Sequence, residues 1–248
     1  MTEDELSRRR TEEGGARRMA NMRPLFVAIE GPIGVGKSTL VRTLADITGW
    51  DAMFEPVEAN PYLDHFYGRA EGVAMEEGMR RWTFPMQIHL LHARYILHQR
   101  ARVSPNGTLQ DRSIYGDTVF ARDHHRTGLM SDLEWGTYRL AWEAMRQHLV
   151  LPDMFIFLDA PVEVLQGRIA ERGRMAESGI PDAYLEGLRD GYAELEQEMR
   201  GHTPCYRFDW TDPDASVRRA IRAVEVVAQD DGFTWARRRP TLLPPERG

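Results

Sequence analysis

Lysine is almost absent from this 248-residue chain: of its 32 lysines and arginines, only Lys37 is a lysine. Cysteine is equally scarce: the single Cys205 excludes an internal disulfide framework and fits a reducing compartment. No apolar run approaches the roughly 20 residues that a membrane-spanning helix needs. The formal net charge of −6 gives no indication of a general nucleic-acid binder. These absences predict a cytoplasmic protein that binds neither membranes nor nucleic acid.

The two ends of the chain differ in composition from its centre. Residues 1–23 mix acidic residues and arginines without an apolar period, so we expect a disordered leader there. Residues 229–248 are polar and rich in proline and arginine, which predicts a poorly ordered tail. The intervening residues 24–228 are sufficient for one domain with its own core.

Short apolar runs alternate with segments of helical periodicity inside this domain. Strands are expected at 25–30, 51–57, 108–113, 154–160 and 205–210. Helices are expected at 37–49, 82–100, 133–149, 161–172, 181–200 and 217–228. One of them, 181–200, has an apolar stripe formed by Tyr184, Leu185, Leu188, Tyr192, Leu195 and Met199. Because the strands are apolar on both faces, the pattern predicts an α/β fold with a five-stranded parallel sheet covered by helices on both faces.

The lone lysine lies in the stretch GPIGVGKS, residues 31–38, which satisfies the phosphate-binding pattern G-x-x-x-x-G-K-[ST]. An apolar strand precedes this stretch and a helix follows it, as the pattern requires. The backbone N–H groups of such a loop and the positive end of the helix bind phosphate oxygens. The predicted nucleotide-binding residues are Gly31, Gly34, Gly36, Lys37, Ser38 and Thr39. Lys37 is expected to contact the β- and γ-phosphates of ATP or GTP, and the Ser38 hydroxyl to bind Mg²⁺.

Three further segments place polar side chains where an acceptor would bind. Glu55 ends the second strand, and the carboxyl ends of parallel strands line the ligand crevice of an open sheet. Gln87 and Arg94 are seven residues apart, about two helical turns, so they share a helix face. The segment after the third strand supplies three more charged side chains: Asp111, Arg112 and Asp117.

These segments resemble the deoxynucleoside kinase family, within the P-loop kinases. The matching stretches are EGPIGVGKST, EPVEANPYL, W-x-F-x-x-Q-x-x-x-x-x-x-R, DRSIYGD and RIAERGRMAESGIP, in family order from about Pro24 to Asp212. ANPYLDHFY, MQIHLLHARY and DRSIYGDTVFA are most similar to bacterial deoxyadenosine kinases, and GPIGVGKST is equally typical of deoxyguanosine kinases. The resemblance implies the three-layer P-loop kinase fold and phosphoryl transfer from ATP with Mg²⁺ to a deoxynucleoside. It also implies a homodimer formed by the long helices at 82–100 and 133–149.

The resemblance implies catalytic roles for the charged residues. Glu55 would be the general base that takes the proton of the 5′-hydroxyl, and Arg112 would hold its carboxylate. Lys37 would complete this catalytic set. Asp111 would help Ser38 to hold Mg²⁺.

Other residues would bind the nucleoside and close over the donor. Tyr67 and Glu177 would hydrogen-bond to the 3′-hydroxyl, with Tyr67 crowding the 2′ position of a ribose. Gln87, Arg94 and Asp117 would bind the base edge. A lid at about residues 168–180 would bring three arginines onto the donor phosphates: Arg168, Arg172 and Arg174.

The predicted base-binding residues are compatible with three bases. The Gln87 amide can present its donor and acceptor in either order, so it matches adenine, guanine or cytosine. Asp117 suits an exocyclic amino group and Arg94 suits a carbonyl or ring nitrogen, which disfavours thymine. We expect deoxyadenosine first, deoxyguanosine second and deoxycytidine as a secondary substrate. Phe120 would either stack on the base or pack in the core.

Two other classes of protein are less compatible with the sequence. A nucleoside monophosphate kinase would need additional basic groups for the phosphate of its acceptor. A GTP-dependent switch would need an N-K-x-D guanine pattern, which is impossible because the only lysine lies in the phosphate-binding loop.

Overall fold

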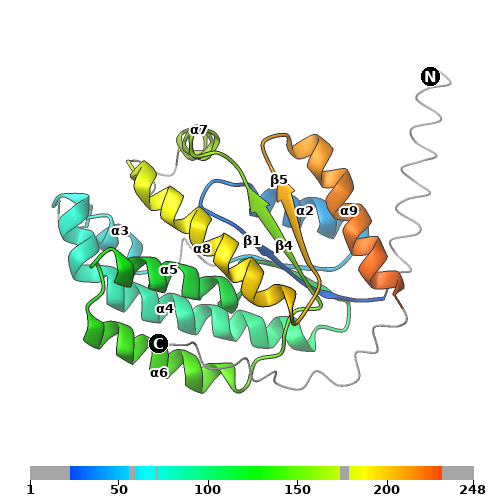
Figure 1. Cartoon of the computed structure of the whole chain (residues 1–248), viewed down its shortest axis with the longest axis horizontal. Coiled ribbons are helices and arrows are strands. Elements are labelled where there is room, and N and C mark those ends of the chain that lie inside the picture. The colour runs from blue at the N-terminus through cyan, green and yellow to red at the C-terminus, as the bar shows by residue number, and fades with distance from the viewer. Residues whose placement is uncertain (1–22, 56–59, 71, 174–178, 231–248) are drawn as a thin grey trace.

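The computed structural model describes residues 23–55, 60–70, 72–173 and 179–230. Five strands form one parallel sheet in the order β2-β3-β1-β4-β5. Their bounds are β1 (Phe26–Glu30), β2 (Asp51–Met53), β3 (Thr108–Asp111), β4 (Met154–Asp159) and β5 (Cys205–Asp209). The predicted α/β fold with a five-stranded parallel sheet is thereby confirmed (Figure 1).

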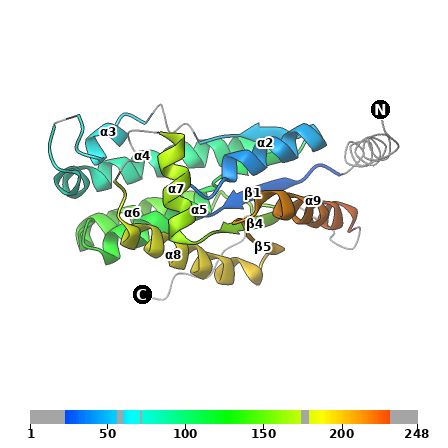
Figure 2. The ribbon, with the colours of Figure 1, turned by 90° about the horizontal axis from the view of Figure 1, so that it is seen from above.

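Helices cover both faces of this sheet. The described helices are α2 (Lys37–Thr48), α3 (Leu63–Phe66), α4 (Met75–Val103), α5 (Ile114–Arg126), α6 (Asp132–Arg146), α7 (Val162–Arg172), α8 (Asp182–Arg200) and α9 (Pro213–Gln229). Apolar residues of α2 and α9 pack with one face of the strands, and those of α4, α5, α6 and α8 pack with the other (Figure 1). α7 runs across the strand direction, close to the loop that joins β1 to α2 (Figure 2).

The structure corrects several predicted bounds. The helix expected at 82–100 is α4, which begins at Met75 and continues through Pro85. β2 ends at Met53 and β3 at Asp111, so both strands are shorter than expected. α9 begins at Pro213 because the Asp212 side chain accepts a hydrogen bond from the Ala215 amide and caps the helix.

Helix α5 was missed entirely at the sequence level. Its residues from Ile114 to Ala121 are all buried, so no polar face produces the 3.6-residue period of an amphipathic helix. The Ser113 hydroxyl caps the helix by accepting from the Tyr115 amide. The predicted leader and tail lie almost wholly outside the described residues, and so does the central part of the predicted lid.

Strand register determines where the polar residues meet. Ile29 of β1 is paired with Asp111 of β3, which places Asp111 beside the residue that leads into the phosphate-binding loop. β2 lies on the other side of β3, so Glu55, two residues beyond β2, approaches the same edge. The carboxyl ends of β1, β2 and β3 therefore bring the loop, Glu55 and Asp111 together. Within the described part of the chain, no helix is long and apolar enough to cross a membrane.

Candidate active site

The loop between β1 and α2 has a backbone that only glycine fits at two key positions. Gly31 has φ 144°, and a Cβ there would lie 2.4 Å from the Leu158 carbonyl oxygen. Gly36 has φ 107° as the N-cap of α2, and a Cβ there would lie 2.7 Å from Nε1 of Trp210. Both positions favour glycine for backbone angle and for space. The loop thus directs the N–H groups at the N-terminus of α2 towards the space in front of the loop, where a phosphate would bind.

The Lys37 ammonium lies across this loop. It donates to the carbonyl oxygens of Gly31 at 2.9 Å and Pro32 at 2.7 Å. Burial, together with the charge of Arg112, lowers the pKa of Lys37 to about 7. A phosphate in the loop would offer this buried cation the opposite charge that it needs.

Two oxygens suited to a divalent cation lie next to the lysine. The Ser38 hydroxyl donates to Oδ2 of Asp111 at 2.5 Å. Hydroxyl and carboxylate oxygens are ligands of hard cations such as Mg²⁺. The described residues contain no cluster of three or more histidine, cysteine or acidic side chains that would hold a metal by itself. A metal here would depend on phosphate oxygens for its remaining ligands.

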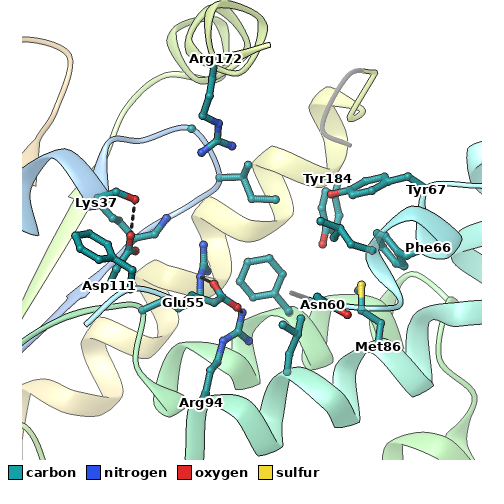
Figure 3. Close-up of a pocket in the computed structure, with 18 of the residues that line it drawn as sticks. Lys37, Glu55, Asn60, Phe66, Tyr67, Met86, Arg94, Asp111, Arg172 and Tyr184 are labelled. Atoms are coloured by element: carbon teal, nitrogen blue, oxygen red, sulfur yellow. Dashed lines mark hydrogen bonds and ion pairs between the residues drawn. The ribbon is translucent and has the colours of Figure 1, made fainter. Parts of the chain in front are cut away.

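A cavity of about 380 Å³ opens in front of the loop. We call one side of it the loop end, where the close-up shows Lys37, Asp111 and Arg172 (Figure 3). The opposite side, the aromatic end, is formed by Phe66, Tyr67, Met86 and Tyr184 (Figure 3). Glu55 and Arg94 lie between the two ends (Figure 3). The volume falls within the range of small-molecule sites, about 300–1,000 Å³.

Glu55 is held by two arginines. Its Oε1 accepts from Nη2 of Arg94 at 2.5 Å, and its Oε2 lies 3.4 Å from Nε of Arg112. Burial alone would raise the pKa of Glu55, but the charges of Arg94 and Arg112 outweigh it and lower the pKa. The predicted pairing with Arg112 is present, and the closer contact with Arg94 was not anticipated. Glu55 is thus an ionised carboxylate, 11% exposed, that faces both ends of the cavity.

Arg112 has an unusual backbone. Among the described residues it is the only non-glycine with positive φ, at 65°, and its amide donates to the Ile29 carbonyl oxygen at 3.0 Å. Its guanidinium donates to the Tyr192 hydroxyl and lies 4.4 Å from the centre of the Phe120 ring. Phe120 also lines the cavity while being 7% exposed, so both alternatives foreseen for it have a structural basis. Positive φ costs free energy in a non-glycine residue, and such residues concentrate at functional sites.

A buried network surrounds Asp117. Its carboxylate accepts from Nη1 of Arg94, from Nε2 of Gln87 at 2.9 Å and from the Tyr138 hydroxyl at 2.7 Å. Burial raises the pKa of Asp117, and these three donors oppose that shift. Arg94 reaches the cavity wall, whereas Gln87 and Asp117 are fully buried and do not line the cavity. The three predicted base-binding residues are therefore in mutual contact, with Arg94 in front.

The remaining predicted residues divide into four groups. Tyr67 and Arg172 line the cavity, and burial raises the pKa of Tyr67 to about 12. Arg168 lies elsewhere, since it donates to the carbonyl oxygens of Val35 at 3.1 Å and Trp210 at 2.9 Å. Thr39 lies in the first turn of α2. Outside the described residues lie Arg174 and Glu177.

Several side chains of the site escaped sequence-level prediction. Tyr184 and Tyr192 belong to the apolar stripe expected on α8, but Tyr184 lines the cavity and Tyr192 bonds to Arg112. Glu30, which ends β1, is fully buried, and its Oε1 accepts from the Ser113 amide at 2.8 Å and hydroxyl at 2.5 Å. A tyrosine within an apolar stripe is a usable signal, because a buried phenol needs a hydrogen-bond partner.

Comparison with known proteins agrees with this geometry. A family model described as deoxynucleoside kinase matches residues 27–225. The deoxyadenosine/deoxycytidine kinase of Bacillus subtilis is 36% identical over 83% of this chain and 94% of its own length. The deoxyadenosine kinase of Dictyostelium discoideum is 32% identical over 75% of this chain and 72% of its own. The deoxyguanosine kinase of B. subtilis is 32% identical over 72% of this chain and 82% of its own.

Solved structures match the fold. A deoxyadenosine kinase from M. mycoides with bound dCTP superimposes with a TM-score of 0.71 at 24% identity, covering 82% of this chain and all of that one. The parallel sheet, the phosphate-binding loop and the Glu55 carboxylate in front of it define a P-loop kinase. With the family match over most of its length, the chain belongs to the deoxynucleoside kinase family.

Proposed function

We propose that this protein transfers the γ-phosphoryl group of ATP to the 5′-hydroxyl of a purine deoxynucleoside. Deoxyadenosine is the preferred acceptor, and deoxycytidine is a secondary one. The observation that carries the proposal is the position of Glu55, a largely buried carboxylate between a phosphate-binding loop and an aromatic pocket in one cavity. A donor at the loop end and a nucleoside at the aromatic end would meet at this carboxylate.

Glu55 acts as the general base in this proposal. The charges of Arg94 and Arg112 lower its pKa, so the carboxylate is ionised and free of protons at neutral pH. It accepts the proton of the 5′-hydroxyl as the oxygen attacks the γ-phosphorus and the bond to the ADP oxygen breaks. Arg112, fixed by Tyr192 and Phe120, holds the carboxylate and lies close to the new bond.

The loop end binds the donor. Lys37 and the N–H groups at the start of α2 bind the β- and γ-phosphates, and Arg172 approaches from α7 (Figure 3). Ser38 and Asp111 would hold Mg²⁺, whose charge neutralises the phosphate oxygens during transfer. These groups act by position and charge and do not depend on which base the acceptor carries.

The aromatic end binds the deoxynucleoside. The Tyr67 phenol, 6% exposed at the cavity wall, hydrogen-bonds to the 3′-hydroxyl and leaves no room for a 2′-hydroxyl. Phe120 lies against the base, and Arg94, supported by Gln87 and Asp117, approaches the base edge. The Bacillus and Dictyostelium relatives named for deoxyadenosine support this choice of base.

We also propose a homodimer formed through α4 and α6. Leu133 is 86% exposed and Leu140 is 75% exposed, and they lie seven residues apart on one face of α6. Exposed leucines at this spacing form an apolar strip that a second copy would cover. Sedimentation equilibrium should give twice the chain mass, and Leu140→Glu should give the monomer.

A phosphorylation assay over the four deoxynucleosides and adenosine tests the proposed activity. We expect the highest kcat/KM for deoxyadenosine, a lower one for deoxycytidine and little transfer to thymidine or adenosine. A maximum at deoxyguanosine would reassign the base, as the deoxyguanosine kinases among the relatives illustrate. Adenosine phosphorylated as well as deoxyadenosine would contradict the role of Tyr67.

A further inference from the structure

Tyr138 does not line the cavity, but it contacts Asp117, one of the predicted base-binding residues. It lies on α6, is 1% exposed, and donates its hydroxyl proton to Oδ2 of Asp117 at 2.7 Å. Nε2 of Gln87 donates to the same oxygen at 2.9 Å. Two side chains from different helices thus converge on one carboxylate oxygen, behind the wall of the cavity.

We propose that Tyr138 is a specificity-determining residue that acts through position: by holding Asp117 as a hydrogen-bond acceptor, it fixes which edge of the Gln87 amide faces the nucleobase. The inference rests on the proposed function and deepens it, because it names the chemical feature that selects the base. That feature is the exocyclic amino group at C6 of adenine or C4 of cytosine, since guanine carries a carbonyl at C6.

The orientation of Gln87 follows from the chemistry of its partner. An ionised carboxylate only accepts hydrogen bonds, so the amide turns its nitrogen to Asp117, whose backbone carbonyl oxygen also accepts from it at a longer 3.3 Å. Its oxygen Oε1 is then left buried with no hydrogen-bond partner among the described residues. Such orphaned acceptors are rare and call for a ligand group. Gln87 does not itself line the cavity, but Met86 and Leu90 of the same helix do, so in this inference the oxygen lies behind the cavity wall and accepts from an amino group of a base that reaches it there.

The Tyr138 ring is itself held in place. The Trp135 indole stacks on it with ring centres 5.6 Å apart, and the His125 imidazole stacks on the indole at 5.2 Å. His125 also pairs with Asp132 at 2.9 Å at the start of α6. This stack supports the phenol ring, whose hydroxyl donates to Asp117.

Loss of the hydroxyl should reverse the amide. Burial raises the pKa of Asp117, and Tyr138 is one of the donors that oppose this. Without that donor the carboxyl group gains a proton more readily and can donate to Oε1 of Gln87. The amide then turns and presents N–H to the base, which matches the carbonyl of guanine rather than an amino group.

The test is Tyr138→Phe, with kcat/KM measured for deoxyadenosine, deoxycytidine and deoxyguanosine. We expect the deoxyadenosine-to-deoxyguanosine ratio to fall about tenfold, the usual effect of one polar contact, and deoxycytidine to fall with deoxyadenosine. The matched control is Tyr115→Phe, which removes a buried hydroxyl on α5, the helix of Asp117, that donates to the Val150 carbonyl oxygen at 3.4 Å and not to the Asp117 carboxylate. This control should leave the ratio unchanged.

A second variant protects the test against a folding defect at position 138. In Asp117→Asn the side chain keeps nearly the same shape, and its amide nitrogen can donate to Oε1 of Gln87. The deoxyadenosine-to-deoxyguanosine ratio should therefore fall in this variant too, and by more than in Tyr138→Phe. If Tyr138→Phe folds and lowers all three values equally, Tyr138 is structural support only and the inference is overturned. An unchanged ratio in both variants overturns it as well, while wild-type activity on deoxynucleosides would leave the proposed function intact.

Discussion

The two ends of the cavity are built in different ways. The loop end comes from one continuous stretch, residues 31–39, whose shape is determined by glycine backbone angles and by the start of α2. The aromatic end is assembled from α3, α4, α5 and α8, and its polar groups are buried side chains that hold one another. A backbone site binds what all nucleoside triphosphates share, whereas a side-chain site can differ between relatives.

This difference separates rate from selectivity. Changes at the loop end should lower the rate with every acceptor to the same degree, because the donor phosphates are the same in each reaction. Changes in the network around Asp117 should alter the ratio between acceptors. Arg94 and Glu55 connect the two ends, since Arg94 bonds to both Glu55 and Asp117.

Glu55→Gln should give the largest loss. The amide keeps the shape of the side chain but cannot take the proton of the 5′-hydroxyl, and positioned general bases contribute about 10²–10⁴-fold. We expect kcat to fall about 10³-fold for deoxyadenosine and deoxyguanosine alike. Steady-state kinetics with both nucleosides measure this. A fall of less than tenfold would remove Glu55 from the role of general base.

The loop end could be predicted from sequence because its information is local. The spacing of Gly31, Gly36 and Lys37 predicts both the backbone conformation of the loop and the position of its positive charge. The structure shows the loop-to-helix geometry that the pattern requires. The alternation of strands and helices was equally visible, since the three inner strands, β1, β3 and β4, are buried on both faces.

The aromatic end could not be predicted to the same depth. Its contacts join residues far apart in the sequence, such as Phe66 of α3 and His124 of α5, and no local period records such a pairing. α5 was missed because Asp117 and Phe120 are both buried on a helix that lacks a polar face. The contact of Arg94 with Glu55 was missed because a helix-face argument shows that two side chains share a side and not which third group they meet.

Lys37→Arg should give the second largest loss. A guanidinium is larger than an ammonium and cannot occupy the position between the Gly31 and Pro32 carbonyl oxygens without displacing the loop. Loss of one such charge-stabilising donor costs about 10²-fold in kcat. The loss should be equal for all deoxynucleosides in the same assay. A changed acceptor ratio would contradict the separation of the two ends.

Tyr192→Phe and Tyr138→Phe compare two buried hydroxyls. Tyr192 supports Arg112 at the reacting group, whereas Tyr138 supports Asp117 behind the base. Loss of a hydrogen bond to a charged group costs about 1.5–3 kcal/mol, so Tyr192→Phe should lower kcat about tenfold or more without altering the acceptor ratio. Tyr206→Phe on β5 is the control, with no expected effect. A shift of the ratio in Tyr192→Phe would show that the two supports are not independent.

The smallest effect is a proton taken up when ATP binds. The pKa of Lys37 is lowered to about 7 by burial and by Arg112, so at about pH 8 most of the free protein carries this amine neutral. Bound phosphates favour the charged form and restore the pKa towards its ordinary value, so about one proton enters with the nucleotide. At about pH 6 the amine is already charged and the uptake should nearly vanish.

Calorimetric titration in buffers of different ionisation enthalpy counts these protons. Lys37→Arg is the control because arginine stays charged throughout, and its titration should show no uptake from this position at either pH. The same lowered pKa makes the stability of the free protein depend on pH. Lys37 keeps its proton up to about pH 10.5 in the unfolded chain and only up to about pH 7 in the folded chain, so the free energy of unfolding should increase as the pH rises between these values. If neither pH showed uptake, the loop carbonyls would keep Lys37 charged in the free protein, and the loop end would then be preorganised for phosphate without any change of protonation.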